Sequence, residues 1–233
     1  MATENRQRLR RRKKQPNIVP GGLATSAYRP LSEIEIHKIH GASLTVLERT
    51  GIQIHASEAR DIFKQAGARV DEANNRVYIP RAMLEDAIAL AANQFVLAGR
   101  DPRHDLQIGG ERVYLGTGGA AIQVLDLDGK MRESNLADIA RIGRLVDALD
   151  NIHFYLRPVV ARDIPKEALD INSAFAALSS TSKHVMTAAF KVNTARQIID
   201  MAAMIMGSKA AYEERPILSF TACWVISPLR YAA

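Results

Sequence analysis

Short apolar segments alternate with longer amphipathic ones over the second half of this 233-residue chain, and this alternation constrains the fold more than any other feature. The apolar segments are predicted strands at 113–115, 152–156, 184–188 and 217–224. The segments with helical spacing of apolar residues are predicted helices at 135–149, 165–179 and 194–206. Strands that alternate with helices of this length form right-handed βαβ units on a parallel sheet. Because the sequence stops after the fourth strand without a covering helix, we expect residues 111–233 to be the N-terminal half of a (β/α)8 TIM-like barrel rather than a small open sheet.

Residues 28–110 lack this alternation and are predicted to form a small α+β cap that precedes the half-barrel. Ser32 and Glu35 have the spacing of a capping box, which predicts the start of a first helix. Two more short helices are expected, one at 57–67 and one from Pro80 onward. An isolated strand is expected between them, at 77–79.

The net charge of +6 comes entirely from the first 14 residues, which hold seven basic side chains and one acidic side chain. The remainder of the chain is balanced, so its charge predicts no nucleic-acid-binding face. Without an apolar anchor, residues 1–27 are predicted to be a disordered leader, with a phosphate-binding arm and a targeting signal as alternatives. The single cysteine, Cys223, excludes an internal disulfide framework, and no apolar run is long enough to cross a membrane. These features predict a cytoplasmic protein.

Five segments between Tyr28 and the end of the chain form a recognisable series. They are Arg29-Pro30-Leu31, Leu47-Glu48-Arg49-Thr50-Gly51-Ile52, Gly116-Thr117-Gly118-Gly119, Leu145-Val146-Asp147-Ala148-Leu149 followed by Asn151-Ile152-His153, and Cys223-Trp224-Val225-Ile226-Ser227-Pro228-Leu229. In this order they resemble the trimethylamine methyltransferase family, the corrinoid-dependent methylamine and betaine methyltransferases. Only the basic leader lies outside the resemblance.

The resemblance implies a TIM-like barrel enzyme that moves a methyl group from a tertiary or quaternary amine, trimethylamine or a betaine, to the Co(I) corrinoid of a partner protein. It implies that the chain itself holds no cofactor and that the full-length enzyme forms homo-oligomers. An N-terminal fragment of such an enzyme lacks part of the pocket, so we expect it to be inactive alone. The alternative is a non-catalytic, truncated scaffold or oligomerisation protein.

The segment Gly116-Thr117-Gly118-Gly119 leaves the first predicted strand at its carboxyl end, where barrels of this kind bind substrate. Exposed backbone N–H groups and small side chains suit the close approach of a carboxylate, a phosphate or a cofactor edge. The spacing matches neither the dinucleotide motif nor the P-loop. A tight turn into the hairpin predicted around Asp128-Gly129 is an equal alternative.

Arg157, Trp224 and Ser227 are the other candidate substrate-binding residues, at the ends of the second and fourth predicted strands. Arg157 is expected to pair with the carboxylate of a betaine, and the alternative is an ion pair with Asp163 or Asp126. Trp224 is expected to face a quaternary ammonium group with its ring, and the alternative is that it packs against the helix layer.

The sequence predicts no catalytic residue and no metal site. The six histidines are scattered, and one cysteine cannot complete a zinc ligand set with them. His153 and His184 precede or begin strands, which predicts positions near the rim opposite the substrate. Cys223 has no paired base and is expected to be a small core residue.

Overall fold

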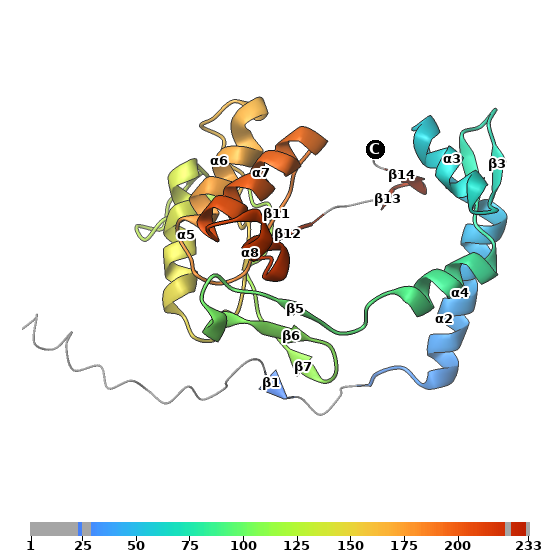
Figure 1. Cartoon of the computed structure of the whole chain (residues 1–233), viewed down its shortest axis with the longest axis horizontal. Coiled ribbons are helices and arrows are strands. Elements are labelled where there is room, and N and C mark those ends of the chain that lie inside the picture. Colours follow the sequence, from blue (N-terminus) through green and yellow to red (C-terminus); the bar gives the residue numbers. More distant parts are fainter. Residues whose placement is uncertain (1–22, 25–28, 222–224, 232–233) are drawn as a thin grey trace, which may run out of the picture. The chain divides into compact units, whose positions relative to one another are not determined.

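The computed structural model describes residues 23–24, 29–221 and 225–231, which form a mixed α/β protein with several small sheets (Figure 1). The chain divides into two compact units. Among the described residues, the first unit holds 94–221 with Leu23–Ala24, and the second holds 29–93 with 225–231.

The first unit has a parallel sheet with helices on one face at its centre. Its elements are β1 (Leu23–Ala24), β5 (Phe95–Leu97), the 3-10 helix η2 (Pro102–His104), β6 (Leu106–Ile108), β7 (Arg112–Val113), β8 (Gln123–Leu125), β9 (Met131–Glu133), α5 (Leu136–Ala148), β10 (Tyr155–Leu156), α6 (Lys166–Leu178), β11 (Val185–Thr187), α7 (Val192–Ile205), α8 (Lys209–Glu214) and β12 (Leu218–Phe220). The parallel order is β10-β11-β12, with Val185 opposite both Tyr155 and Leu218. A parallel bridge between Gly116 and Phe154 adds the segment after β7 beside β10. Within the described residues these four segments do not close into a barrel.

The predicted helices of this unit are confirmed, and their starts follow local sequence signals. Asn135 and Asp138 make both bonds of a capping box at the start of α5. Pro165 precedes α6, where its missing N–H costs no helical bond. Strand β12 ends at Phe220, and residues 222–224 of the predicted fourth strand lie outside the described residues. Helix α8 was not predicted.

Side chains alternate between two environments along residues 153–161, with the odd-numbered positions buried and the even-numbered positions up to 160 half-buried. The buried face includes Tyr155, whose hydroxyl donates to the carbonyl oxygen of Ile139 in α5 at 2.9 Å. Helices α5, α6 and α7 pack side by side, and buried side chains from all three join one core with those of the strands (Figure 1). Parallel sheets are usually covered on both faces. Here the second face, which carries Leu156 and Met186, is only half-buried.

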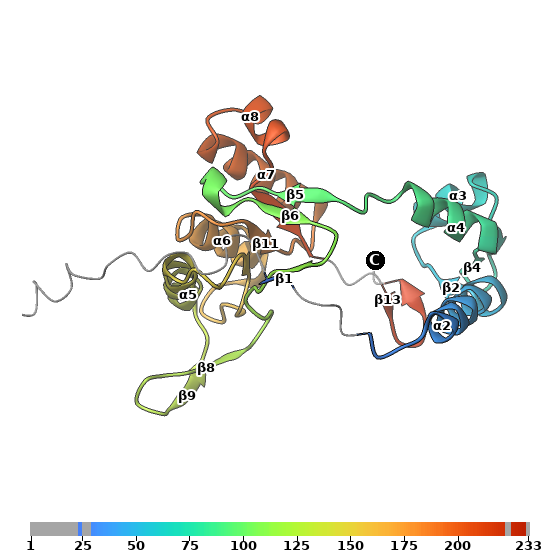
Figure 2. The ribbon, with the colours of Figure 1, turned by 90° about the horizontal axis from the view of Figure 1, so that it is seen from below.

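The predicted hairpin is confirmed as β8 and β9, which pair antiparallel. Its turn is Asp128-Gly129, and the positive φ of 78° at Gly129 is a conformation that favours glycine. Figure 2 shows the hairpin extending away from the helices of its unit.

The second unit contains a five-stranded sheet with a small core of its own around Ile54 and Val77. Its elements are α2 (Glu33–Thr45), the π-helix η1 (Val46–Thr50), β2 (Ile52–Gln53), α3 (Ser57–Gln65), β3 (Arg69–Asp71), β4 (Arg76–Tyr78), α4 (Arg81–Leu90), β13 (Val225–Ile226) and β14 (Arg230–Tyr231). The capping box of Ser32 and Glu35 is confirmed. Strand β14 lies parallel to β2, with Arg230 opposite Gln53, so the last described strands belong to this sheet.

Candidate functional site

The carboxyl ends of the parallel strands lie along one edge of the sheet in the first unit, because all of them run in the same direction. In α/β folds this edge is where ligands bind. The residues that leave the strands there are Gly116 to Gly119, Arg157, Ala188 to Phe190, and Thr221.

The glycine-rich segment has both structural and open positions. An added Cβ at Gly116 would lie 2.3 Å from the ring of Phe154, so only glycine lets the chain pass beside that ring. Thr117 uses its hydroxyl on the backbone of Leu156, donating to the carbonyl oxygen and accepting from the N–H at 2.9 Å. Gly118, by contrast, is exposed and has nothing within 4 Å of an added Cβ. The segment therefore docks on β10 through its first half and leaves the second half accessible.

Arg157 lies on the buried face of β10 and pairs with Asp170 of α6, with 3.3 Å between Nη1 and Oδ1. The two side chains are only 10% and 7% exposed. The other carboxylate oxygen of Asp170 accepts the backbone N–H of Phe190 at 2.9 Å. Asp170 therefore joins the end of β10 to the loop that follows β11.

This ion pair corrects the partners expected for Arg157. Asp126 pairs with Arg132 instead, and Asp163 accepts the N–H of Leu136 at the start of α5. Sequence reasoning missed Asp170, although a signal was present: it lies on the same helical face as the buried residues Ser173, Ala174 and Ala177. A carboxylate on a buried helix face needs a buried partner. The substrate role of Arg157 stays a prediction.

The remaining predicted binding residues are not assembled with these. Ser227 is exposed in the turn between β13 and β14, in the second unit, and does not end a strand of the parallel sheet. The expectation that it follows the fourth parallel strand is wrong, because Ser227 lies between β13 and β14 of the five-stranded sheet. Trp224 and Cys223 lie outside the described residues.

The hairpin beside the glycine-rich segment is fixed at its base by Arg132. This guanidinium binds Asp126 and also both carboxylate oxygens of Asp138, at 2.6 and 2.7 Å. Hydrogen bonds from Arg132 lower the pKa of Asp138 to about 2, so the pair is ionised at neutral pH. The hairpin is thus tied to the first turn of α5 at the carboxyl edge.

Buried basic groups lie at the opposite edge of the sheet, as predicted for His153 and His184. His184 is bonded through Nδ1 to the carbonyl oxygen of Ala98 and through Nε2 to the hydroxyl of Ser219, each at 2.9 Å. Burial lowers the pKa of both histidines, which favours their neutral forms. Lys183 donates to three backbone carbonyls around the end of α5, at 2.6 to 2.7 Å. These groups stabilise the amino edge and do not face the candidate site.

Comparison with known proteins decides the family. A family model described as trimethylamine methyltransferase (MTTB) matches residues 2–233. The chain belongs to the trimethylamine methyltransferase family. The match includes the basic leader, which corrects the expectation that the likeness to this family begins near Tyr28.

Curated relatives in the trimethylamine methyltransferase family are named for two substrates, trimethylamine and glycine betaine. The trimethylamine methyltransferase MttB of Desulfitobacterium hafniense is 37% identical over 200 residues, which are 85% of this chain and 40% of the relative. The glycine betaine methyltransferase of the same species is 27% identical over 211 residues, 90% of this chain and 43% of the relative. The trimethylamine methyltransferase MttB1 of Methanosarcina mazei is 34% identical over 197 residues, 81% of this chain and 39% of the relative. The chain spans about two-fifths of the length of these relatives.

No group of three or more His, Cys, Asp or Glu side chains is placed to hold a metal ion in the part that the structure describes. Among the same residues, no helix combines the length and apolarity needed to cross a bilayer.

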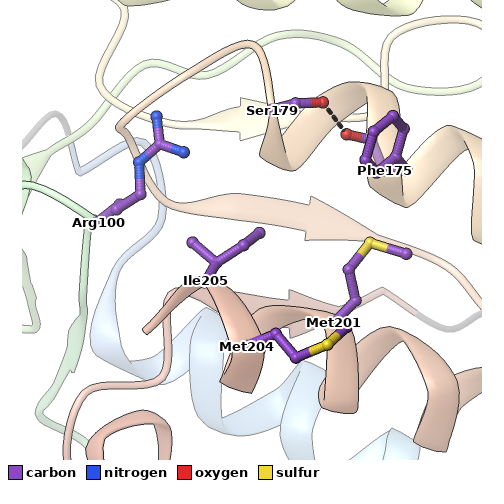
Figure 3. Close-up of a pocket in the computed structure, with 6 residues that line it drawn as sticks. All are labelled: Arg100, Phe175, Ser179, Met201, Met204 and Ile205. Atoms are coloured by element: carbon purple, nitrogen blue, oxygen red, sulfur yellow. Dashed lines mark hydrogen bonds between the residues drawn. The ribbon is translucent and has the colours of Figure 1, made fainter. Parts of the chain in front are cut away.

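A groove of about 410 Å³ lies between α6 and α7 (Figure 3). Its wall is mostly apolar, and it is lined by Arg100, Phe175, Ser179, Met201, Met204 and Ile205. Arg100 donates to the carbonyl oxygen of Leu178 at 3.1 Å, at the end of α6 that leads to the amino edge of the sheet. Of the predicted binding residues that the structure describes, none lines this groove.

Proposed function

We propose that the protein is a methyltransferase that takes a methyl group from a tertiary or quaternary amine and transfers it to the Co(I) corrinoid of a partner protein. The family match over residues 2–233 carries this proposal. Relatives named for trimethylamine and for glycine betaine support the substrate class, because both molecules present methyl groups on nitrogen.

The chemistry defines what the protein has to do. The methyl carbon leaves a nitrogen whose positive charge makes it a good leaving group, and the electron pair of the broken C–N bond stays on that nitrogen. The corrinoid supplies the nucleophile when its carrier protein is bound. The protein has to bind the ammonium group, orient one methyl group outward and exclude water from the transfer.

We further propose that the parallel segments of the first unit are the first strands of a (β/α)8 barrel. Support comes from the neighbouring order of four parallel segments and from the helices packed on one face. The half-buried second face, with Leu156 and Met186, has the side-chain character of a barrel interior that layers from further strands would fill.

Within this frame, the accessible part of the substrate site is the carboxyl edge. Gly118 and Gly119 are exposed there and offer backbone N–H groups to an approaching ligand. Arg157 can serve a betaine carboxylate only by exchanging it for Asp170, with which it already pairs. Trp224 lies outside the described residues and its substrate role stays a prediction, whereas Ser227 belongs to the second unit and is not proposed again.

Methyl transfer to free cob(I)alamin tests the proposal. A protein of the relatives' length that contains this chain is incubated with trimethylamine or glycine betaine, and methylcobalamin is followed by its absorption spectrum. We expect transfer from one of the two amines, and none with the 233-residue chain alone. The scaffold alternative predicts no transfer from either amine in the longer protein, and that result would overturn the proposal.

A further inference from the structure

A buried carboxylate organises the carboxyl edge of the parallel sheet. Asp170 contacts Arg157 at the end of β10 through Oδ1 and the backbone N–H of Phe190 through Oδ2. Both charged side chains are about nine-tenths buried. Burying two charges has a large desolvation cost, and a hydrophobic pair of the same volume is often at least as stable. Fold stability alone therefore does not account for a carboxylate at this position.

The group that Asp170 holds in place is an exposed aromatic residue. Phe190 comes three residues after Thr187, the last residue of β11, and its side chain is 81% exposed. Single exposed apolar residues are common on protein surfaces. Phe190 differs because its backbone is fixed by a buried ionic group at the edge where α/β folds bind ligands.

The ion pair between Asp170 and Arg157 removes one positive charge from this edge, where the exposed Lys191 follows Phe190. A quaternary or tertiary ammonium group is attracted to the face of an aromatic ring. An unpaired Arg157 at the same edge would repel such a ligand, but Asp170 neutralises the guanidinium. The two functions of the carboxylate, positioning the Phe190 backbone and cancelling the charge of Arg157, therefore act in the same direction.

We propose that Phe190 is an ammonium-binding residue of the methylated-amine site and that Asp170 is the positioning residue that makes it effective. This inference rests on the proposed function and adds to it a specific contact for the charged end of the substrate.

Choline and its carbon isostere, in which a quaternary carbon replaces the nitrogen, are suitable probes because they differ in charge and hardly in shape. Their affinities for the 233-residue chain are measured by NMR titration. Phe190→Ala is expected to weaken choline binding about fivefold or more while affecting the isostere less, because the cation–π attraction acts on the charge. Phe190→Trp keeps an aromatic face and is expected to preserve the preference for choline. Phe175→Ala is the matched control, since Phe175 is 60% exposed but lies in the groove of Figure 3, and it should change neither affinity.

Variants that change the charge of Asp170 and Arg157 test the positioning role of Asp170. Asp170→Asn keeps an oxygen for the Phe190 N–H but leaves Arg157 unpaired, so the preference for choline over the isostere should fall. Adding Arg157→Met removes the second charge and should restore that preference, which a merely structural role would not do. Circular dichroism checks that each variant is folded.

Equal choline binding by the wild-type chain and Phe190→Ala would overturn the inference, and so would an absence of choline binding to the wild-type chain. Neither result bears on the proposed function, which is judged separately by methyl transfer from trimethylamine or glycine betaine.

Discussion

Removal of the Asp170 carboxylate is expected to destabilise the protein strongly. Asp170→Ala leaves the Arg157 guanidinium buried without its partner, and breaking a buried ion pair in this way costs about 3–5 kcal/mol. The single contact at 3.3 Å places Arg157 near the lower limit, about 3 kcal/mol, and the lost acceptor of the Phe190 N–H adds about 1 kcal/mol. The two losses together are about 4 kcal/mol. For a chain of this size each kcal/mol shifts Tm by about 2–4 °C, so Tm should fall by roughly 8–16 °C.

Urea unfolding gives the magnitude, measured at a concentration where the chain elutes as one species. The double variant Asp170→Leu/Arg157→Met removes both charges and should cost less than about 1.5 kcal/mol. Lys209→Ala is the control: its partner Glu213 is four residues away, the two side chains are 77% and 64% exposed, and the cost should be about 0.5 kcal/mol or less. If Asp170→Ala were as mild as Lys209→Ala, the buried pair would not be a structural unit of the fold, and the reasoning would fail.

Two further predictions concern other parts of the first unit. Gly116→Ala should lower the free energy of unfolding by about 1–3 kcal/mol, because its Cβ would overlap the ring of Phe154, whereas Gly118→Ala has open space and should change it little. Urea midpoints of the two variants check this, and equal losses would contradict the contact. Burial lowers the pKa of His184, so the unfolded chain takes up that proton first as the pH falls. Stability should therefore be complete above about pH 6.5 and decrease below it, by at most about 1.4 kcal/mol per pH unit for this histidine. Unfolding at pH 7.5 and 5.5 should show a smaller pH dependence in His184→Gln, and an unchanged one would contradict the assignment.

Local signals in the sequence were sufficient for most of the helices and for the hairpin. The capping boxes at Ser32 and Asn135 and the Asp128-Gly129 turn are satisfied within a few residues of chain, so their outcome depends little on the rest of the molecule. Strand pairing is different, because it joins distant segments. Arg230 pairs with Gln53 in the second unit, and no pattern near either residue specifies that partner. For this reason the prediction placed Ser227 in the wrong sheet.

The candidate site shows the same division between local and distant information. Both faces of β10 carry apolar residues, as expected for a parallel strand, so alternation alone did not indicate that Arg157 points toward the helices. The informative residue was on the helix. Asp170 interrupts a face whose other members are small and buried, and a carboxylate there requires a cation from the adjacent strand, for which Arg157 at the end of β10 is well placed. A buried charge on an amphipathic helix therefore predicts the orientation of a strand-end arginine better than the strand's own sequence does.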